Sequence, residues 1–258
     1  MYLDKILARH RSLAADDDRD LDQLIEAASR MPATRGFRRQ LSTDSARHLA
    51  VIAEIKRRSP SKGDLKVNLD PSELAKIYEE SGASCVSVLT DEEFFGGSRS
   101  DLIAARESIG IPVLRKDFTV SLKDVCDARL MGADCVLLIV AALSVDELKS
   151  MHRLAEDLGL DVLVEVHDEP ELESAMECGA RLVGVNQRDL KTFAVDRARA
   201  IRMAPLMPAD VVKVAESGVV GPDDARELRA AGYHAVLVGE SLVRSTAPGE
   251  SLRDLLVR

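Results

Sequence analysis

One short phrase occurs four times in this chain, and its spacing limits the folds available to it. The copies are GASCVSVL, GADCVLLI, GARLVGV and GYHAVLVG, which begin about 50 residues apart at Gly82, Gly132, Gly179 and Gly232. Each joins a glycine that can end a helix in the left-handed conformation to a β-branched run typical of a strand buried on both faces. An interval of this length holds two strand–helix units, so each should contain a second strand.

Four further apolar runs precede or separate these copies and are predicted as strands: His48–Lys56, Pro112–Lys116, Asp161–Val166 and Val211–Glu216. Capping residues and apolar spacing predict a helix after each strand. The expected helices are Pro71–Ser81, Asp101–Ser108, Leu122–Met131, Val145–Leu158, Pro170–Cys178, Arg197–Ala204, Pro222–Ala231 and Leu252–Val257. Eight strands alternating with eight helices are most economically closed as an α/β fold, the (β/α)8 or TIM barrel. Periodicity alone leaves a doubly wound open sheet as the alternative.

The chain length fits one such barrel. At 258 residues it matches the roughly 250 residues typical of this fold. The first predicted strand begins only at residue 48, so residues 1–47 are expected to form an N-terminal extension that caps part of the barrel, helical at Tyr2–Leu13 and Leu21–Ser29. Residues 48–258 would then form the catalytic barrel, giving one domain overall.

Charge and cysteine usage exclude several classes of partner. The net charge is −9 and no basic block is present, so neither a nucleic acid nor a membrane is expected as a partner. The N-terminus lacks the apolar stretch of a signal peptide or membrane helix. The four cysteines form no C-x-x-C pair and are interpreted as buried free thiols in a reducing cytoplasm.

Charged residues end several predicted strands, where the active site of a barrel forms. They are Glu54, Lys56, Lys116, Glu165 and Glu216. Side-chain alternation places the first two on one strand face. Buried charges are costly unless they are paired or used, so this convergence favours catalysis over a structural layer of salt bridges. Either lysine in a dry pocket can also form a Schiff base, and the residues leave that role open.

The residues give no support for a bound metal or nucleotide. The histidines, His10, His48, His152, His167 and His234, lack metal-ligand spacing, and only His167 is expected near the mouth of the barrel. No G-x-G-x-x-G or P-loop motif follows a strand, so no cofactor is expected.

A phosphate site is predicted after the last two strands. Ser217-Gly218 and Gly239-Glu240 follow them directly, and glycines there let backbone N–H groups approach an anion. These two loops are the usual phosphate position in such barrels. Arg57–Gly63 combines basic side chains with a proline and a glycine, which suits either a closing lid or an ordinary loop.

Six motifs in order resemble the indole-3-glycerol phosphate synthase family. They are VIAEIKRRSPSKG (51–63), PVLRKDF (112–118), LLIVAAL (137–143), VEV (164–166), GVNQRDL (184–190) and AESG (215–218). The resemblance covers residues 48–245 closely and the N-terminal helices loosely. It implies ring closure, decarboxylation and dehydration of 1-(2-carboxyphenylamino)-1-deoxyribulose 5-phosphate to indole-3-glycerol phosphate, carbon dioxide and water, in tryptophan biosynthesis.

The resemblance also implies residue roles. Lys116 would protonate the substrate carbonyl during ring closure, and Lys56, Ser59 and Arg188 would hold the substrate carboxylate. Lys56 or Lys116 would be the acid and Glu165 the base for loss of the hydroxyl. The remaining implied residues orient hydroxyls and lysines (Glu54, Asn186, Glu216), contact the phosphate (Ser217, Gly218, Gly239, Glu240) or cover the aromatic ring (Phe95, Phe118).

Two positions depart from the family pattern. Lys123-Asp124 stand where the family usually has Tyr-Gln, and are expected on a helix away from the chemistry. Glu240 stands where serine is common, so its side chain is expected to point away from the phosphate. Two alternatives remain: another phosphate-sugar barrel isomerase or lyase, and a non-catalytic phosphate-binding barrel. The expected partner is a small phosphorylated substrate, and the expected state is a monomer or weak homodimer.

Overall fold

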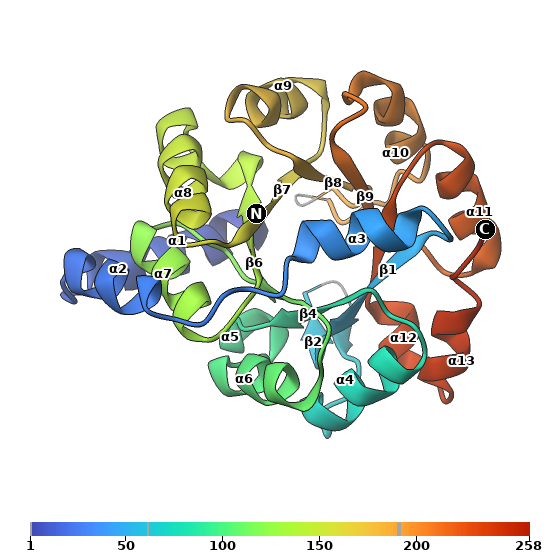
Figure 1. Ribbon diagram of the computed structural model, residues 1–258, viewed down its shortest axis with the longest axis horizontal. Coiled ribbons are helices and arrows are strands. Elements are labelled where there is room, and N and C mark those ends of the chain that lie inside the picture. The colour runs from blue at the N-terminus through green and yellow to red at the C-terminus, as the bar shows by residue number, and fades with distance from the viewer. Residues whose placement is uncertain (1, 61, 190–191) are drawn as a thin grey trace.

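Eight parallel strands close into a barrel in the computed structural model, which describes residues 2–60, 62–189 and 192–258 (Figure 1). Neighbouring strands pair in chain order, and the last returns to pair with the first. The (β/α)8 prediction is therefore confirmed, and the open sheet is wrong. The barrel strands are β1 (Ala50–Ile55), β4 (Cys85–Leu89), β5 (Val113–Lys116), β6 (Cys135–Ile139), β7 (Asp161–Val166), β8 (Leu182–Asn186), β9 (Val212–Glu216) and β10 (Ala235–Val238).

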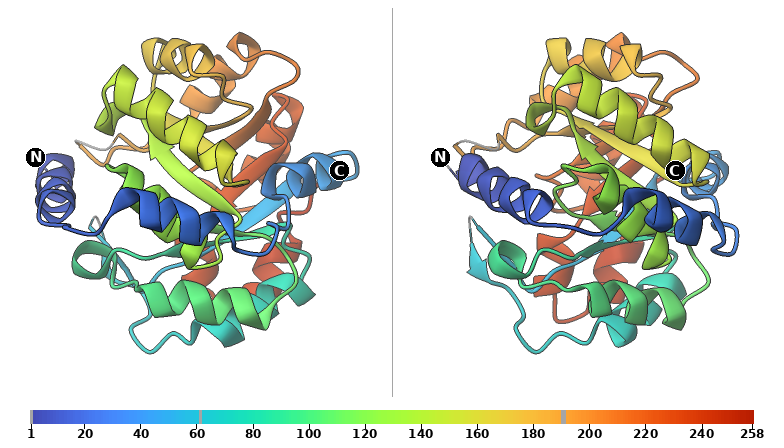
Figure 2. Two further views of the ribbon diagram at one scale, coloured as in Figure 1. Left: turned by 60° about the vertical axis from the view of Figure 1, so that its left-hand side comes forward. Right: turned by 90° about the vertical axis from the view of Figure 1, so that its left-hand side faces the viewer.

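Helices surround the strands on the outside of the barrel (Figures 1 and 2). Local capping explains where several begin: Asp70 accepts hydrogen bonds from the first turn of α4, and Ser144 and Glu147 bond reciprocally at the start of α8. These helices are α4 (Pro71–Glu80), α5 (Glu92–Phe95), α6 (Arg99–Ser108), α7 (Leu122–Leu130), α8 (Val145–Asp157), α9 (Glu169–Glu177), α10 (Ala198–Met203), α11 (Pro222–Ala230), α12 (Glu240–Arg244) and α13 (Pro248–Arg253).

The C-terminal helix prediction is wrong in its bounds. Helix α13 begins at Pro248, earlier than expected, and Val257 lies beyond it. There the Val257 carbonyl accepts a hydrogen bond from Leu49 N just before β1. This hydrogen bond ties the end of the chain to the barrel, and the end is not helical. Several short elements were not predicted at all: helix α5, the two-residue strands β2 (Arg58–Ser59) and β3 (Gly63–Asp64), and the 3-10 turns Val140–Ala142 and Ala204–Leu206.

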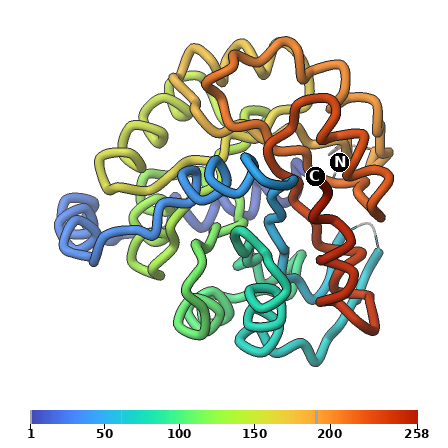
Figure 3. Tube along the Cα trace, turned by 45° about the vertical axis from the view of Figure 1, so that its right-hand side comes forward, coloured from blue at the N-terminus to red at the C-terminus, as the bar shows by residue number. Residues whose placement is uncertain are grey.

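The N-terminal segment runs from one end of the barrel to the other, as the right-hand view of Figure 2 and Figure 3 show. Helix α1 (Tyr2–Ala15) lies at the mouth, α2 (Leu21–Ser29) packs on α7, and α3 (Phe37–Ser45) contacts β1, β4 and β9 at the opposite end. Helix α3 was not predicted. It inserts Phe37 and Leu41, both fully buried, into the floor of the barrel.

Two apolar clusters follow from the alternation of side chains along each strand. One joins the outward faces of the strands to the helices, and the other fills the lower interior. On β1, Val51 and Ala53 belong to the outer cluster and Ala50 and Ile52 to the inner one. No helix among the described residues is long and apolar enough to cross a membrane.

Candidate active site

A pocket of about 590 Å³ opens at the carboxyl ends of the strands. Five of the strands carry inward-facing polar or charged residues at or near their ends that line it: Glu54, Lys116, Glu165, Asn186 and Glu216. The site residues predicted from the sequence all line it: Glu54, Lys56, Ser59, Phe95, Lys116, Phe118, Glu165, Asn186, Arg188, Glu216, Ser217, Gly218, Gly239 and Glu240.

Lys116, the last residue of β5, lies between two buried carboxyl groups. Its Nζ is 3.5 Å from Glu165 Oε2 and 3.7 Å from Glu216 Oε2. Burial lowers the pKa of Lys116, but the carboxylates of Glu165, Glu216 and Glu54 outweigh burial and raise the pKa above its usual value. The amine is therefore an ammonium at neutral pH.

The two carboxyl groups beside Lys116 have pKa values shifted in opposite directions. Burial raises the pKa of Glu165, but Lys116, His167 and the Asn186 amide together lower it below its usual value. Burial and the neighbouring Glu165 charge raise the pKa of Glu216 well above its usual value. These directions favour the charged form of Glu165 and the protonated form of Glu216.

Asn186 and His167 hold the Glu165 carboxylate in place. Asn186 Nδ2 donates to Glu165 Oε1 at 3.0 Å, and His167 Nε2 lies 3.5 Å from the same oxygen. The other ring nitrogen of His167 lies 3.0 Å from Glu171 Oε2 on α9. His167 therefore stands behind Glu165 rather than in the pocket.

A second ion pair between a lysine and a glutamate forms at the end of β1. Lys56 Nζ lies 2.6 Å from Glu54 Oε1. The same carboxylate fills the space beside Gly239, where a Cβ would lie 2.4 Å from Glu54 Oε1. Gly184 has the same relation to Glu216, with 2.0 Å between a built Cβ and Oε1. These glycines make room for the carboxyl groups of neighbouring strands, a role that the sequence did not indicate.

Only part of the loop after β1 faces the pocket. Ser59 and Lys62 line it, whereas Arg57 pairs with Asp101 and Arg58 Nε lies 3.5 Å from Asp64. The two arginines are thus engaged in holding the β2–β3 hairpin. Ser61, in the loop 57–63 that the sequence suggests as a lid, lies outside the described residues. Leu190 of the GVNQRDL motif also lies outside them.

The loops after β9 and β10 differ in detail from expectation. Ser217 and Gly218 both have positive φ, 63° and 75°, which turns the chain sharply after β9. Glu240 lines the pocket. Its carboxylate lies 3.8 Å from Arg188 and 4.0 Å from Arg244, and these guanidinium groups offset its charge.

Several pocket residues were not predicted. Leu3 and Ile6 of α1, together with Arg197 and Arg244, also line the pocket. The helical pattern of residues 2–13 predicts the apolar face of α1. Nothing in the sequence predicts that this face lies over the mouth of the barrel. Both arginines are exposed, and no sequence signal separates them from the other exposed arginines of the chain.

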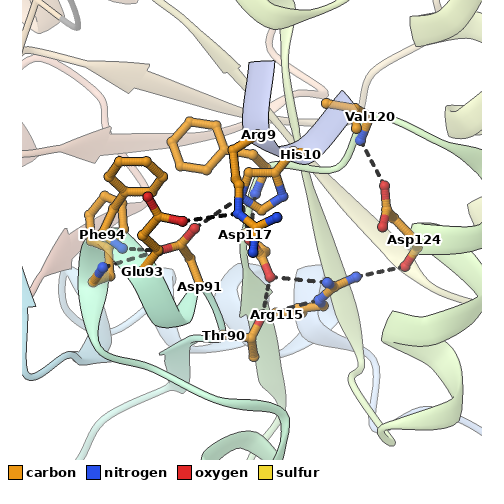
Figure 4. A network of polar contacts seen from close by, with 12 residues as sticks. Arg9, His10, Thr90, Asp91, Glu93, Phe94, Arg115, Asp117, Val120 and Asp124 are labelled. Atoms are coloured by element: carbon orange, nitrogen blue, oxygen red, sulfur yellow. Dashed lines mark hydrogen bonds and ion pairs between the residues drawn. The ribbon is translucent and has the colours of Figure 1, made fainter. Parts of the chain in front are cut away.

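The prediction that only His167 lies near the mouth is wrong. His10 of α1 also reaches it: its ring stacks on Phe118, which lines the pocket, with centroids 5.5 Å apart. His10 Nε2 lies 2.9 Å from Asp91 Oδ2 and 3.7 Å from Asp117 Oδ1 (Figure 4). Lys123 and Asp124 lie on α7, as expected.

Comparison with known proteins agrees with this geometry. The family model of indole-3-glycerol phosphate synthase matches residues 3–255. An indole-3-glycerol phosphate synthase of a Nocardioides species is 56% identical over 80% of this chain and 79% of its own length. One from a Parafrankia species is 48% identical over 98% of this chain and 94% of its own.

A solved structure supports the fold alone. Thiamine phosphate pyrophosphorylase from Pyrococcus furiosus has a TM-score of 0.61 at 16% identity, over 83% of this chain and 95% of that one. The family match and the two relatives decide between the alternatives left open by the sequence. The chain belongs to the indole-3-glycerol phosphate synthase family.

Proposed function

We propose that Lys116, Glu165 and Lys56 carry out the family reaction at the mouth of this barrel. The chain is a carbon–carbon lyase of tryptophan biosynthesis that forms indole-3-glycerol phosphate from 1-(2-carboxyphenylamino)-1-deoxyribulose 5-phosphate. The observation that carries the assignment of roles is the position of Lys116 Nζ between the buried carboxyl groups of Glu165 and Glu216.

Lys116 is the acid in ring closure. As the ring carbon attacks the carbonyl carbon, the carbonyl oxygen gains charge and needs a proton. The raised pKa of Lys116 keeps it protonated, which supports an acid over a Schiff-base nucleophile because a nucleophilic amine must be neutral.

Lys56, Ser59 and Arg188 hold the substrate carboxylate out of conjugation, so that loss of carbon dioxide restores the aromatic ring. The Ser59 hydroxyl is buried without a hydrogen-bond partner among the described residues, which leaves it available to substrate. Phe95 and Phe118, with ring centroids 6.2 Å apart, cover the aromatic ring.

Glu165 is the base for dehydration. Its lowered pKa keeps it ionised, and Asn186 fixes one of its oxygens. Lys56 or Lys116 protonates the departing hydroxyl, while Glu54 and Glu216 orient the lysines and substrate hydroxyls. Ring closure and dehydration each take one proton from a lysine, and Glu165 can return one proton to Lys116, so one further proton is taken up from solvent in each turnover.

The phosphate binds to the loops after β9 and β10. Backbone N–H groups at Ser217, Gly218, Gly239 and Glu240 would supply the contacts, helped by the positive φ values at the first two. The Glu240 side chain stays paired with Arg188 and leaves its N–H to the phosphate.

We further propose that residues 1–47 cap the barrel as an extension and that the protein works as a cytoplasmic monomer or weak homodimer. Cys85, Cys126 and Cys135 are free and buried, and Cys178 is free, which suits a reducing compartment. Sedimentation at several concentrations tests the assembly state.

Synthetic substrate tests the activity directly. We expect indole fluorescence to appear on incubation, against a low background because the chain has no tryptophan. Consumption of substrate without indole, or no reaction at all, would refute the proposal.

A further inference from the structure

We propose that His10 is a positioning residue for ring closure, which fastens helix α1 to the two loops that hold Phe95 and Phe118 over the pocket. The inference rests on the proposed role of these rings as the cover of the substrate aromatic ring. It starts from a polar network beside the mouth, drawn in Figure 4, that the reaction itself does not use.

Each carboxylate that meets His10 also holds one of the two loops. Asp91 Oδ1 accepts the backbone N–H of Phe95 at 3.1 Å and of Phe94 at 2.6 Å, which caps helix α5. Asp117 Oδ1 accepts the backbone N–H of Phe118 at 2.9 Å. One imidazole therefore bridges the backbone anchors of both aromatic residues.

The ring of His10 adds direct contact to this bridge. It packs against Phe118 at 5.5 Å, and Phe118 in turn lies 6.2 Å from Phe95. One helical turn before His10, Ile6 lines the pocket beside these rings. The contacts that dock α1 on the barrel therefore also position the two aromatic rings.

A metal ion would need the oxygens of this cluster to be free. His10, Asp91 and Asp117 do bring three ligand atoms within 4.8 Å of one another. However, Asp91 already caps α5, and Asp117 Oδ2 accepts from Thr90 and from Arg115 Nη2 at 3.0 Å. The contacts describe a completed hydrogen-bond network, which favours positioning over metal binding.

The bridge should depend on the charge of His10. Burial opposes that charge, but Asp91, Asp117 and Asp124 outweigh burial and raise the pKa of His10. The other charged groups facing it are already paired: Arg115 with Asp117, and Arg9 with Glu93 at 2.9 Å. The ion pair is therefore complete below the raised pKa and is lost as pH rises through it.

Steady-state kinetics between pH 6 and pH 9 test the inference. At the acidic end we expect His10→Gln to raise KM roughly three- to tenfold, as for loss of one charged hydrogen bond, with kcat at saturation within about twofold. The KM of the parent protein should rise with pH toward that of the variant. His10→Lys, which stays charged, should keep KM low across the range.

A matched control is His152→Gln on α8, since His152 is also buried and lies 3.4 Å from a glutamate, Glu156, but away from the pocket. It should leave KM and its pH profile unchanged. Hydrogen exchange gives a readout independent of turnover: His10→Gln should speed exchange in residues 2–15 and 92–96 and at Phe118, and not elsewhere.

The outcomes separate the two proposals. Faster exchange with unchanged KM, or an unchanged pH profile in His10→Gln, would overturn the positioning role. Absence of turnover by the parent protein would instead refute the proposed function, while hydrogen exchange would still report whether His10 fastens α1.

Discussion

The floor and the mouth of the barrel are built from the same strands but have opposite chemistry. Apolar Ile52 and Glu54 lie two positions apart on β1, as do apolar Leu114 and Lys116 on β5. At the floor, Leu41 of α3 completes a dry apolar cluster. At the mouth, polar atoms such as Glu216 Oε1 are buried without a hydrogen-bond partner among the described residues.

This difference indicates how the molecule divides stability from function. Each buried, unpartnered polar group costs about 1–3 kcal/mol, so the mouth lowers the free energy of unfolding in exchange for groups free to meet substrate. The floor and the outer apolar cluster offset this cost. Substitutions at the two ends should therefore act on different observables, turnover at the mouth and stability at the floor.

The largest effect on turnover is expected from Lys116→Met at the mouth. Loss of the proposed acid should lower kcat by at least about 10²–10⁴-fold, while a substrate analogue binds within about tenfold of the parent because the proton acts mainly in the transition state. Lys149→Met on the exposed face of α8 is the control. Near-parental turnover of Lys116→Met would remove the assignment.

Glu165→Gln should slow a step after decarboxylation, because the amide cannot take a proton during dehydration. Chemical quench should trap an intermediate that has lost the substrate carboxylate, and kcat should fall by roughly 10²–10⁴-fold. If only unreacted substrate accumulates, Glu165 acts earlier than proposed.

The matched control is Glu216→Gln. Glu216 Oε2 lies 3.7 Å from Lys116 Nζ, on the other side of the lysine from Glu165. Since burial and the Glu165 charge raise the pKa of Glu216, which favours its protonated form, the amide is a close mimic and kcat should change far less than in Glu165→Gln. A protein with a buried acid whose pKa is raised in the folded state loses stability as pH rises above the pKa of that acid in the unfolded state. The melting temperature of Glu216→Gln relative to the parent should therefore increase with pH.

Substitutions of Gly218 and Gly239, the two glycines of the proposed phosphate loops, should have different effects. Gly218→Val forces a side chain into a backbone with φ of 75° and within 2.7 Å of Val195, so KM should rise strongly for the phosphorylated substrate and little for a dephospho analogue. Gly239→Val also displaces Glu54 and should lower kcat as well.

Inorganic phosphate provides the check on this pair. It should compete with substrate and weakly raise the melting temperature of the parent, since it binds the folded state. Unchanged KM in both glycine variants, together with no phosphate protection, would contradict the assignment.

The smallest effect on turnover is expected at the floor. Leu41→Ala should lower the free energy of unfolding by about 2–5 kcal/mol, as for other buried leucines, and leave kcat and KM unchanged. Urea titration and steady-state kinetics on the same sample test both parts. A large loss of kcat would show that the two ends are coupled.

Regular elements were predictable because their signals are local. The glycine–strand phrase recurs with each second strand, and helix caps such as Ser144 act within one turn. Helix α3 and the β2–β3 hairpin escaped prediction because their residues are held by distant partners, as Arg57 is by Asp101.

The candidate site was predictable to a similar depth. Charged residues at strand ends must meet once the barrel closes, so Glu54, Lys56, Lys116, Glu165 and Glu216 were identified from the sequence. Their pKa shifts were not, because the opposite shifts at Glu165 and Glu216 arise from burial, from the charge of one carboxyl group on the other and from the neighbouring Lys116. Arg197, Arg244 and Leu3 were missed for the same reason: their place in the pocket depends on packing.

The sequence by itself determined the eight strand–helix units, which favoured a closed barrel over an open sheet, and the charged residues at the strand ends, since periodicity and strand-end position are properties of neighbouring residues. Only the tertiary structure decided the opposite pKa shifts of Glu165 and Glu216, that Gly184 and Gly239 make room for glutamates, and that His10 reaches the mouth. These features depend on distances between residues far apart in the chain, such as Gly184 and Glu216, 32 positions apart, or His10 and Asp91, 81 positions apart. Local patterns carry no information about such distances.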